Sequence, residues 1–472
     1  MNQLTALEAG FLEAEDSDGH VSLAIGGVAV LEGPIPDYHS LVATLGPRIL
    51  ACPRFAQRLR SRPFDLAAPD WVADSAFDMS HHMLRISIPA PGEDQELFDL
   101  IAQIMSWRLD RTRPLWELWI IEGLSHNRWA LLMKVHHCIA DGVAISHMFA
   151  GLSDAGLGES FSGRAHPSAT PGSADLRPVP SPESPPAART DSMGWIGQWW
   201  RISAAMAKTA RDAAGLAVGL LRSAPSSLNG PMSSLRRYSA GRVSLADVRQ
   251  VCKVFDVTIN DVALAALTES YRASLIRRGE QPRPDSLRTL VPVSTRQPDA
   301  AGEIDNRVSM MLPCLPVEED NPVRRLRAVH ARLHKATPTG QPRPGDAVIS
   351  AVDHLPFSLT AWAVRLLTRL PQHAVATLAT NIPGPSHSLR ILGCAVTEVM
   401  PIPPIAMQLR TGVAILSYAD DLYFGILGDF EAAVDVGELA RGVEIAVARL
   451  VTRSKKPRPE RDHHGLSLVV NA

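Results

Sequence analysis

This sequence has few cysteines, almost no net charge and no long apolar run. Its 472 residues include 47 basic and 49 acidic side chains, and the formal net charge is −2. A nucleic-acid-binding protein usually carries a clear positive excess, so this balance argues against that class of partner. No apolar run reaches the roughly 20 residues of a membrane-spanning helix, and the first residues lack the basic and apolar regions of a signal peptide. We therefore expect a cytoplasmic protein that binds no nucleic acid.

The five cysteines are scattered, odd in number and without the spacing of metal ligands. Such usage is typical of a reduced intracellular protein rather than of a disulfide-stabilised one. We expect no metal site, and we interpret Cys138, which follows two histidines, as a small packing residue. Apolar residues, by contrast, are plentiful: they make up 46% of the chain, enough for a sizeable core and two domains.

Segments with helical and strand-like spacing alternate along both halves of the chain, which predicts a layered α/β architecture. Between the halves, residues 163–189 are rich in proline, serine, alanine and glycine, a composition typical of a flexible linker. We expect a site in the cleft between the two halves. The predicted division is an N-terminal domain at 1–160, a linker with an amphipathic helix at 161–230, a C-terminal domain at 231–453 and a charged tail at 454–472.

The segment that follows the linker, residues 193–223, combines an alanine- and leucine-rich face with Trp195, Trp199 and Trp200. A helix of this composition either packs on the domains or rests on a lipid surface. We favour packing, and contact with a membrane or a lipid droplet stays open as a hypothesis.

The most informative stretch lies at the end of an apolar run, residues 130–135. It continues with His136 and His137, and then with Asp141 and Gly142 at the start of an amphipathic segment. A short, bounded apolar run is typical of a buried strand, so we expect the histidines in a loop between a strand and a helix. A neutral imidazole, with an unperturbed pKa of about 6.5, can take a proton from an alcohol near neutral pH. His137 is the candidate general base, and the four residues together form the candidate catalytic motif.

Asp141 is expected to fix this loop, either by capping the helix that follows or by pairing with a distant arginine. Gly142 would let the backbone turn sharply or approach a substrate. Two other interpretations stay open: an ordinary loop with an Asp-Gly turn, or a metal site built from the histidines and the aspartate. Adjacent residues on an extended chain point to opposite faces, so His136 and His137 would not readily bind one ion. Metal binding is therefore the weakest of the three.

Four further blocks accompany this motif, in a fixed order along the chain. They are Pro-Leu-Trp-Glu at 114–117, Asn260-Asp261 at a helix start, Pro-Val-Ser-Thr-Arg at 292–296 and Asn-Ile-Pro-Gly-Pro at 381–385. Together the five blocks resemble the bacterial wax ester synthase/acyl-CoA:diacylglycerol acyltransferases over nearly the whole chain. The His-His-x-x-x-Asp-Gly motif alone is less specific, since chloramphenicol acetyltransferases, carnitine acyltransferases and peptide-synthetase condensation domains carry relatives of it. The resemblance implies an α/β fold of two chloramphenicol-acetyltransferase-like domains, with the active site at their interface.

The resemblance also implies a mechanism and its substrates. His137 would deprotonate the hydroxyl of diacylglycerol or of a long-chain alcohol, which attacks the thioester of acyl-CoA and releases coenzyme A. Acyl-CoA is then a substrate, and no cofactor is required. Asn260 is the candidate substrate-binding residue, as a donor to the oxyanion, although a helix N-cap at this position would be purely structural. Arg296 is the candidate structural partner of Asp141.

Two rival functions share the same motif. One is a condensation-type acyltransferase that uses a carrier protein, and the absence of a carrier domain or attachment site from the chain argues weakly against it. The other is a non-catalytic lipid-binding paralogue. The intact motif argues against it, because a protein without activity would be free to lose these residues. A second histidine pair, His81-His82, is interpreted as structural.

Overall fold

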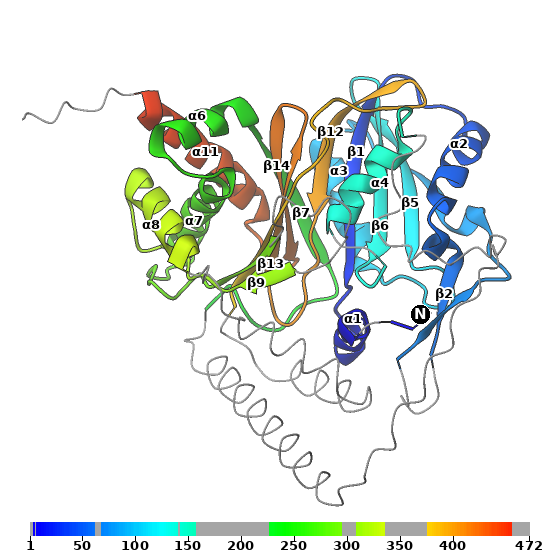
Figure 1. Ribbon diagram of the computed structural model, residues 1–472, viewed down its shortest axis with the longest axis horizontal. Helices are drawn as coiled ribbons and strands as arrows, with labels where there is room; N and C mark the ends of the chain where they lie inside the picture. The colour runs from blue at the N-terminus through cyan, green and yellow to red at the C-terminus, as the bar shows by residue number, and fades with distance from the viewer. Residues whose placement is uncertain are drawn as a thin grey trace, which may run out of the picture.

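The computed structural model describes residues 3–4, 6–61, 68–139, 142–156, 226–294, 308–335 and 375–455. The predicted linker, the tryptophan-containing segment, the charged tail, Asp141 and Arg296 lie outside the described residues. The described chain forms two six-stranded sheets, each with helices of its own, side by side (Figure 1). The two-part α/β architecture predicted from the sequence is confirmed.

The first sheet has the strand order β11-β12-β1-β6-β5-β4. Its strands are β1 (Ala24–Glu32), β4 (Met83–Ser87), β5 (Trp116–Leu124), β6 (Arg128–His136), β11 (Arg390–Ile391) and β12 (Cys394–Ile402). The helices of this half are α1 (Ala6–Ser17), α2 (Tyr38–Leu50), α3 (Asp94–Ser106) and α4 (Gly142–Leu152). Helix α4 contacts both α2 and β1. A small antiparallel ribbon of β2 (Gln57–Arg60) and β3 (Asp70–Ala73) flanks them.

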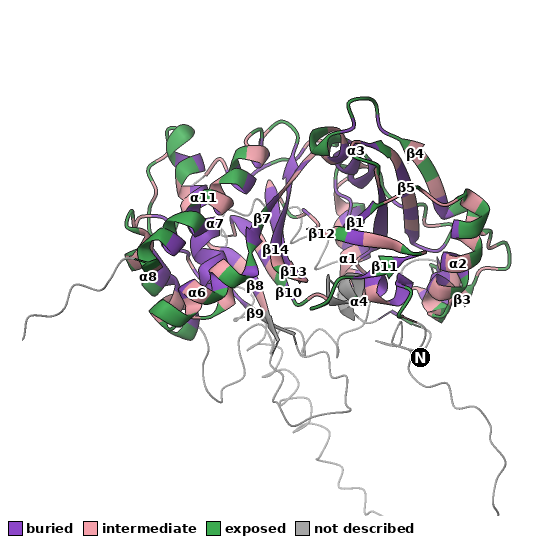
Figure 2. Cartoon of the chain, turned by 90° about the horizontal axis from the view of Figure 1, so that it is seen from above, coloured by how far each residue is buried: buried purple, intermediate pink, exposed green. Residues whose placement is uncertain are grey.

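The second sheet has the order β7-β14-β13-β10-β8-β9. Its strands are β7 (Arg236–Ser244), β8 (Thr289–Ser294), β9 (Val308–Met311), β10 (Thr377–Ile382), β13 (Thr411–Tyr418) and β14 (Asp421–Asp429). Among the described residues, the helices that accompany it are α6 (Leu245–Phe255), α7 (Ile259–Arg277), α8 (Pro322–Lys335) and α11 (Val436–Lys455). Most residues of the strands are buried, whereas the outer faces of the helices are exposed (Figure 2). None of the described helices is long and apolar enough to cross a membrane.

The two halves exchange a segment. Strand β12, although it follows most of the second sheet in the sequence, pairs antiparallel with β1 of the first. It also contacts β13 and β14, and α3 contacts β7 across the same boundary. At Gly425 in β14, an added Cβ would lie 1.7 Å from the carbonyl oxygen of Pro401, so only glycine permits this approach. The sequence division at residues 160 and 231 remains a prediction, and it did not foresee this exchange.

Candidate active site

The His-His loop connects the middle of the first sheet to a helix, as the apolar run predicts. Strand β6 lies between β1 and β5, and its last residue, His136, pairs with Ala24 of β1. Every residue of β6 after Arg128 is buried, because both faces of the strand are covered. Helix α4 begins at Gly142, at the predicted place. The loop is therefore anchored at one end by a central strand and at the other by a helix.

His137, the candidate general base, is partly buried rather than sealed in the core. Its backbone N–H donates to the carbonyl oxygen of Leu23, with an N···O distance of 3.0 Å. Its imidazole ring lies against the ring of Phe11 from α1, with ring centroids 4.2 Å apart. The imidazole ring therefore packs against Phe11 on one side, while the side chain remains partly exposed to solvent.

His136 has a different environment from its neighbour. It is 1% exposed, and its Nδ1 accepts a hydrogen bond from the backbone N–H of Cys138 at 3.2 Å. Its Nε2 lies 3.5 Å from Oε2 of Glu15, a carboxylate of α1 that is also 1% exposed. The buried thiol of Cys138 also lies 3.0 Å from Nδ1 of His136, and burial raises the pKa of this thiol, which favours the neutral thiol over a nucleophilic thiolate.

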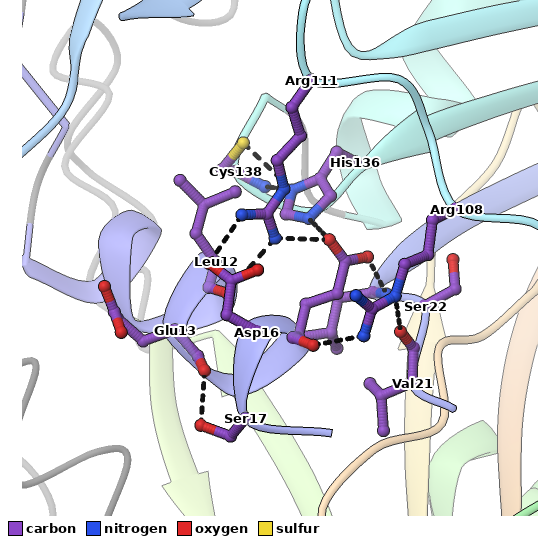
Figure 3. Close-up of polar contacts among 12 residues, drawn as sticks. Leu12, Glu13, Asp16, Ser17, Val21, Ser22, Arg108, Arg111, His136 and Cys138 are labelled. Atoms are coloured by element: carbon purple, nitrogen blue, oxygen red, sulfur yellow. Dashed lines mark hydrogen bonds and ion pairs between the residues drawn. The ribbon is translucent and has the colours of Figure 1, made fainter. Parts of the chain in front are cut away.

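Glu15 is held by three groups and was not foreseen from the sequence. Its carboxylate accepts from the Leu23 backbone N–H at 3.0 Å and from Arg111 at 2.6 Å, besides facing His136. Burial opposes ionisation, but His136, Arg111 and the Leu23 N–H outweigh it and lower the pKa of Glu15 to about 2. Arg111 also binds Asp16 and the Leu12 carbonyl oxygen of the same helix (Figure 3). One signal was available: Glu15 is three residues after buried Leu12, on the apolar face of its helix.

Asn260 faces Asn381, which brings together two blocks that are far apart in the sequence. Nδ2 of Asn381, near the end of β10, donates to Oδ1 of Asn260 at 3.4 Å. Strand β10 also contacts α4, the helix that follows the His-His loop. The suggestion that Asn260 is a helix N-cap is wrong, because the cap of α7 is Thr258, which forms a capping box with Asp261. The side chain of Asn260 is therefore not used to start the helix.

Two other sequence blocks form a packed turn and part of the core. In the turn after β10, an added Cβ on Gly384 would lie 1.9 Å from the Ser417 carbonyl oxygen, so the block at 381–385 is tightly fixed. In the block at 114–117, Trp116 is fully buried and donates to the Phe55 carbonyl oxygen at 2.8 Å. His82 stacks on Trp116, with ring centroids 4.6 Å apart, and burial lowers the pKa of this imidazole. His82 therefore has the structural role predicted for it.

The predicted site residues thus fall into three groups. His136, His137 and the start of α4 at Gly142 lie at one loop, whereas Asn260 lies on the second half of the molecule, beside a strand that contacts α4. Asp141 and Arg296 are outside the described residues, so their pairing stays a prediction. Within the described residues there is no cluster of three or more histidine, cysteine or acidic side chains that could hold a metal ion.

Two protein-family models together match most of this chain. The family model of the wax ester synthase/diacylglycerol acyltransferase catalytic domain matches residues 4–263, and that of the C-terminal domain matches residues 304–450. A protein of Mycobacterium tuberculosis named "Probable diacyglycerol O-acyltransferase tgs1" is 56% identical over 470 residues, which span 100% of both chains.

Solved structures show the same fold. A wax ester synthase/diacylglycerol acyltransferase from Marinobacter aquaeolei superposes with a TM-score of 0.68 at 23% identity, covering 96% of this chain and 100% of the other. The first condensation domain of the calcium-dependent antibiotic synthetase superposes with a TM-score of 0.58 at 14% identity, covering 97% of each chain. Both similarities concern the fold.

Proposed function

This chain belongs to the wax ester synthase/diacylglycerol acyltransferase family and is a diacylglycerol O-acyltransferase, and we propose that His137 is the general base of its reaction. The observation that carries the proposal is the contrast between the two histidines of the loop. His136 is buried among a carboxylate, a thiol and a backbone amide, whereas His137 remains partly exposed at the end of the central strand. Of the two, only His137 retains exposure to meet a substrate hydroxyl.

The proposed chemistry is a direct transfer. His137 takes the proton of the acceptor hydroxyl while the acceptor oxygen attacks the thioester carbon of acyl-CoA. A C–O bond forms, the C–S bond of the tetrahedral intermediate breaks, and the imidazolium returns the proton to the leaving thiolate. The products are triacylglycerol and free coenzyme A. Because the base activates the acceptor itself, neither an acyl-enzyme nor a cofactor is required.

Asn260 is proposed to help stabilise the oxyanion of the intermediate. Its Oδ1 accepts from Asn381, so the N–H groups of its own amide are not engaged in that bond. A preorganised amide donor is the kind of group that stabilises developing negative charge. Asp141 and Arg296 are proposed, as the sequence predicts, to pair and to hold the loop.

The test is acyl transfer from radiolabelled acyl-CoA, with diacylglycerol and hexadecanol offered side by side and the products separated by thin-layer chromatography. We expect His137→Ala to lower kcat by about 10²- to 10⁴-fold, the usual contribution of a general base. His147→Ala is the matched control, since this histidine lies exposed on α4, directly after the motif. Full activity of His137→Ala would refute the assignment. The hexadecanol arm measures whether wax ester synthesis accompanies triacylglycerol synthesis.

Diacylglycerol resides in membranes, and we propose that the chain reaches it by peripheral contact with a membrane or lipid-droplet surface. The support is the sequence of residues 193–223, with Trp195, Trp199 and Trp200 at its start. In a liposome flotation assay we expect Trp195→Ala/Trp199→Ala to reduce association. Unchanged flotation of this variant would rule out a lipid-anchoring role for the two tryptophans.

A further inference from the structure

Helix α1 supplies two side chains to the His-His loop from one face. Phe11 lies against the ring of His137, and Glu15 faces the ring of His136. Residues four apart in a helix lie one above the other on the same face, so one rigid element touches both imidazoles. None of the five motif blocks includes a residue of this helix.

The hydrogen bonds of His136 determine where its proton lies. Its Nδ1 accepts from the Cys138 backbone N–H, so this nitrogen carries no proton. Neutral His136 therefore has its proton on Nε2, the nitrogen that faces Glu15. Within the described residues this nitrogen forms no hydrogen bond, and the Glu15 carboxylate faces it at 3.5 Å. The carboxylate and the Cys138 N–H therefore act on opposite nitrogens of the ring and together orient it.

A second path leads from the same carboxylate to His137. Oε1 of Glu15 accepts from the Leu23 N–H, and the carbonyl oxygen of Leu23 accepts from the His137 N–H, each at 3.0 Å. One backbone residue thus joins the carboxylate to the main chain of the proposed base. The Glu15 carboxylate is therefore connected to both histidines of the loop: directly to the ring of His136, and through Leu23 to the backbone of His137.

We propose that Glu15 is a positioning residue, which holds the His136-His137 loop through the imidazole of His136 and the backbone of Leu23. This rests on the proposed function, in which His137 is the base. Asp141 is then not the sole acidic residue that orders the loop. Glu15 itself does not touch the substrate, since it is 1% exposed.

Several charged or titratable groups surround this arrangement. Arg111 pairs with Glu15 from the segment before β5, Lys134 of β6 interacts with Glu15, and Glu8 of α1 interacts with Cys138. Removing the Glu15 carboxylate would take a negative charge away from the loop and leave Arg111 paired only with the half-exposed Asp16. A positive charge disfavours imidazolium, so the pKa of the base would fall.

The test is Glu15→Gln, compared with Asp16→Asn in the full-length chain. Both variants remove one carboxylate that binds Arg111, but Asp16 is half-exposed, and within the described residues the groups that hold His136 and Leu23 are on Glu15 rather than Asp16. In Glu15→Gln the amide N–H groups meet other donors, and we expect kcat to fall about 10- to 100-fold, as when a carboxylate that orients a metal-binding histidine is removed. KM for both substrates should stay unchanged, and the acid limb of the kcat profile should move to lower pH. Asp16→Asn should match the wild type in kcat, in KM and in the position of the acid limb.

Equal kcat and equal acid limbs in the two variants would overturn the proposal. The His137→Ala variant separates this outcome from failure of the proposed function. Full activity of His137→Ala would show that His137 is not the general base, whatever the role of Glu15. If Glu15→Gln does not fold, ¹⁵N-histidine NMR of the wild type decides. A neutral His136 protonated on Nε2 supports the proposal, and a proton on Nδ1 overturns it.

Discussion

Each half of the molecule places a buried acidic residue of a helix against a histidine, but the two pairs differ in what else they hold. In the first half, Glu15 of α1 binds Arg111 and the backbone of Leu23, neither of which belongs to its own helix. In the second half, Asp261 of α7 lies 2.8 Å from Nδ1 of His330 and otherwise binds Thr258, the cap of its own helix.

This difference assigns different tasks to the same chemical pair. Glu15 connects three segments that are far apart in the sequence, and its histidine is 1% exposed. The His330 side chain is 34% exposed, so water can replace its partner. Loss of the first pair should therefore disturb the loop of the proposed base, and loss of the second should disturb only the start of a helix.

The largest effect that separates the two pairs is expected in the pH dependence of stability. The pKa of Glu15 falls from 4.5 in the unfolded chain to about 2 in the fold. Its contribution is therefore complete above about pH 4.5 and is lost as the pH falls toward 2. By linkage this contribution is on the order of 3 kcal/mol.

Urea unfolding of the wild type and of Glu15→Gln, at several pH values between 7 and 3, measures this contribution. We expect a gap in the free energy of unfolding that is widest at pH 7 and narrows steadily below about pH 4.5. Asp16→Asn serves as the control, and it should change stability by less than about 1 kcal/mol, as usual for a partly exposed ion pair. A gap that stays constant with pH would contradict the ionic role of Glu15.

Sequence patterns predicted the elements that depend on local chemistry. The apolar run before the histidines became β6, and the helix start expected at the Asn260-Asp261 block became the first turn of α7, with its Thr258-Asp261 capping box. These features depend on residues within a few positions of one another, which a single sequence displays. The loop of the proposed site was predicted in the same way, because its residues are adjacent in the chain.

What the sequence did not predict depends on packing between distant segments. The pairing of β12 with β1 joins residues more than 350 positions apart, and no local pattern specifies that partner. Glu15 was missed for the same reason, since its function depends on Arg111 and His136 reaching α1. The N-cap suggested at Asn260 was wrong by two positions because Thr258 also satisfies the cap pattern.

The smallest effect is expected at the second pair, in the variant Asp261→Ala. This change removes the acceptor of the Thr258 N–H and hydroxyl, at 2.8 and 2.9 Å, and the partner of His330. The Thr258 hydroxyl would lose its Asp261 acceptor but still accept from the residue 261 N–H, so half of the capping box remains. We expect a loss of about 1 kcal/mol in the free energy of unfolding, typical for a helix cap.

The acyltransferase activity of Asp261→Ala should stay close to that of the wild type. The contact between Asn260 and Asn381 does not involve the Asp261 side chain, and the variant leaves α1 and its two contacts with the His-His loop intact. His330→Gln, which removes only the exposed partner, should cost still less stability than Asp261→Ala. A fall in kcat as large as that of Glu15→Gln would mean that α7 orders the site as strongly as α1 does. The contrast between the two acid–histidine pairs would then be wrong.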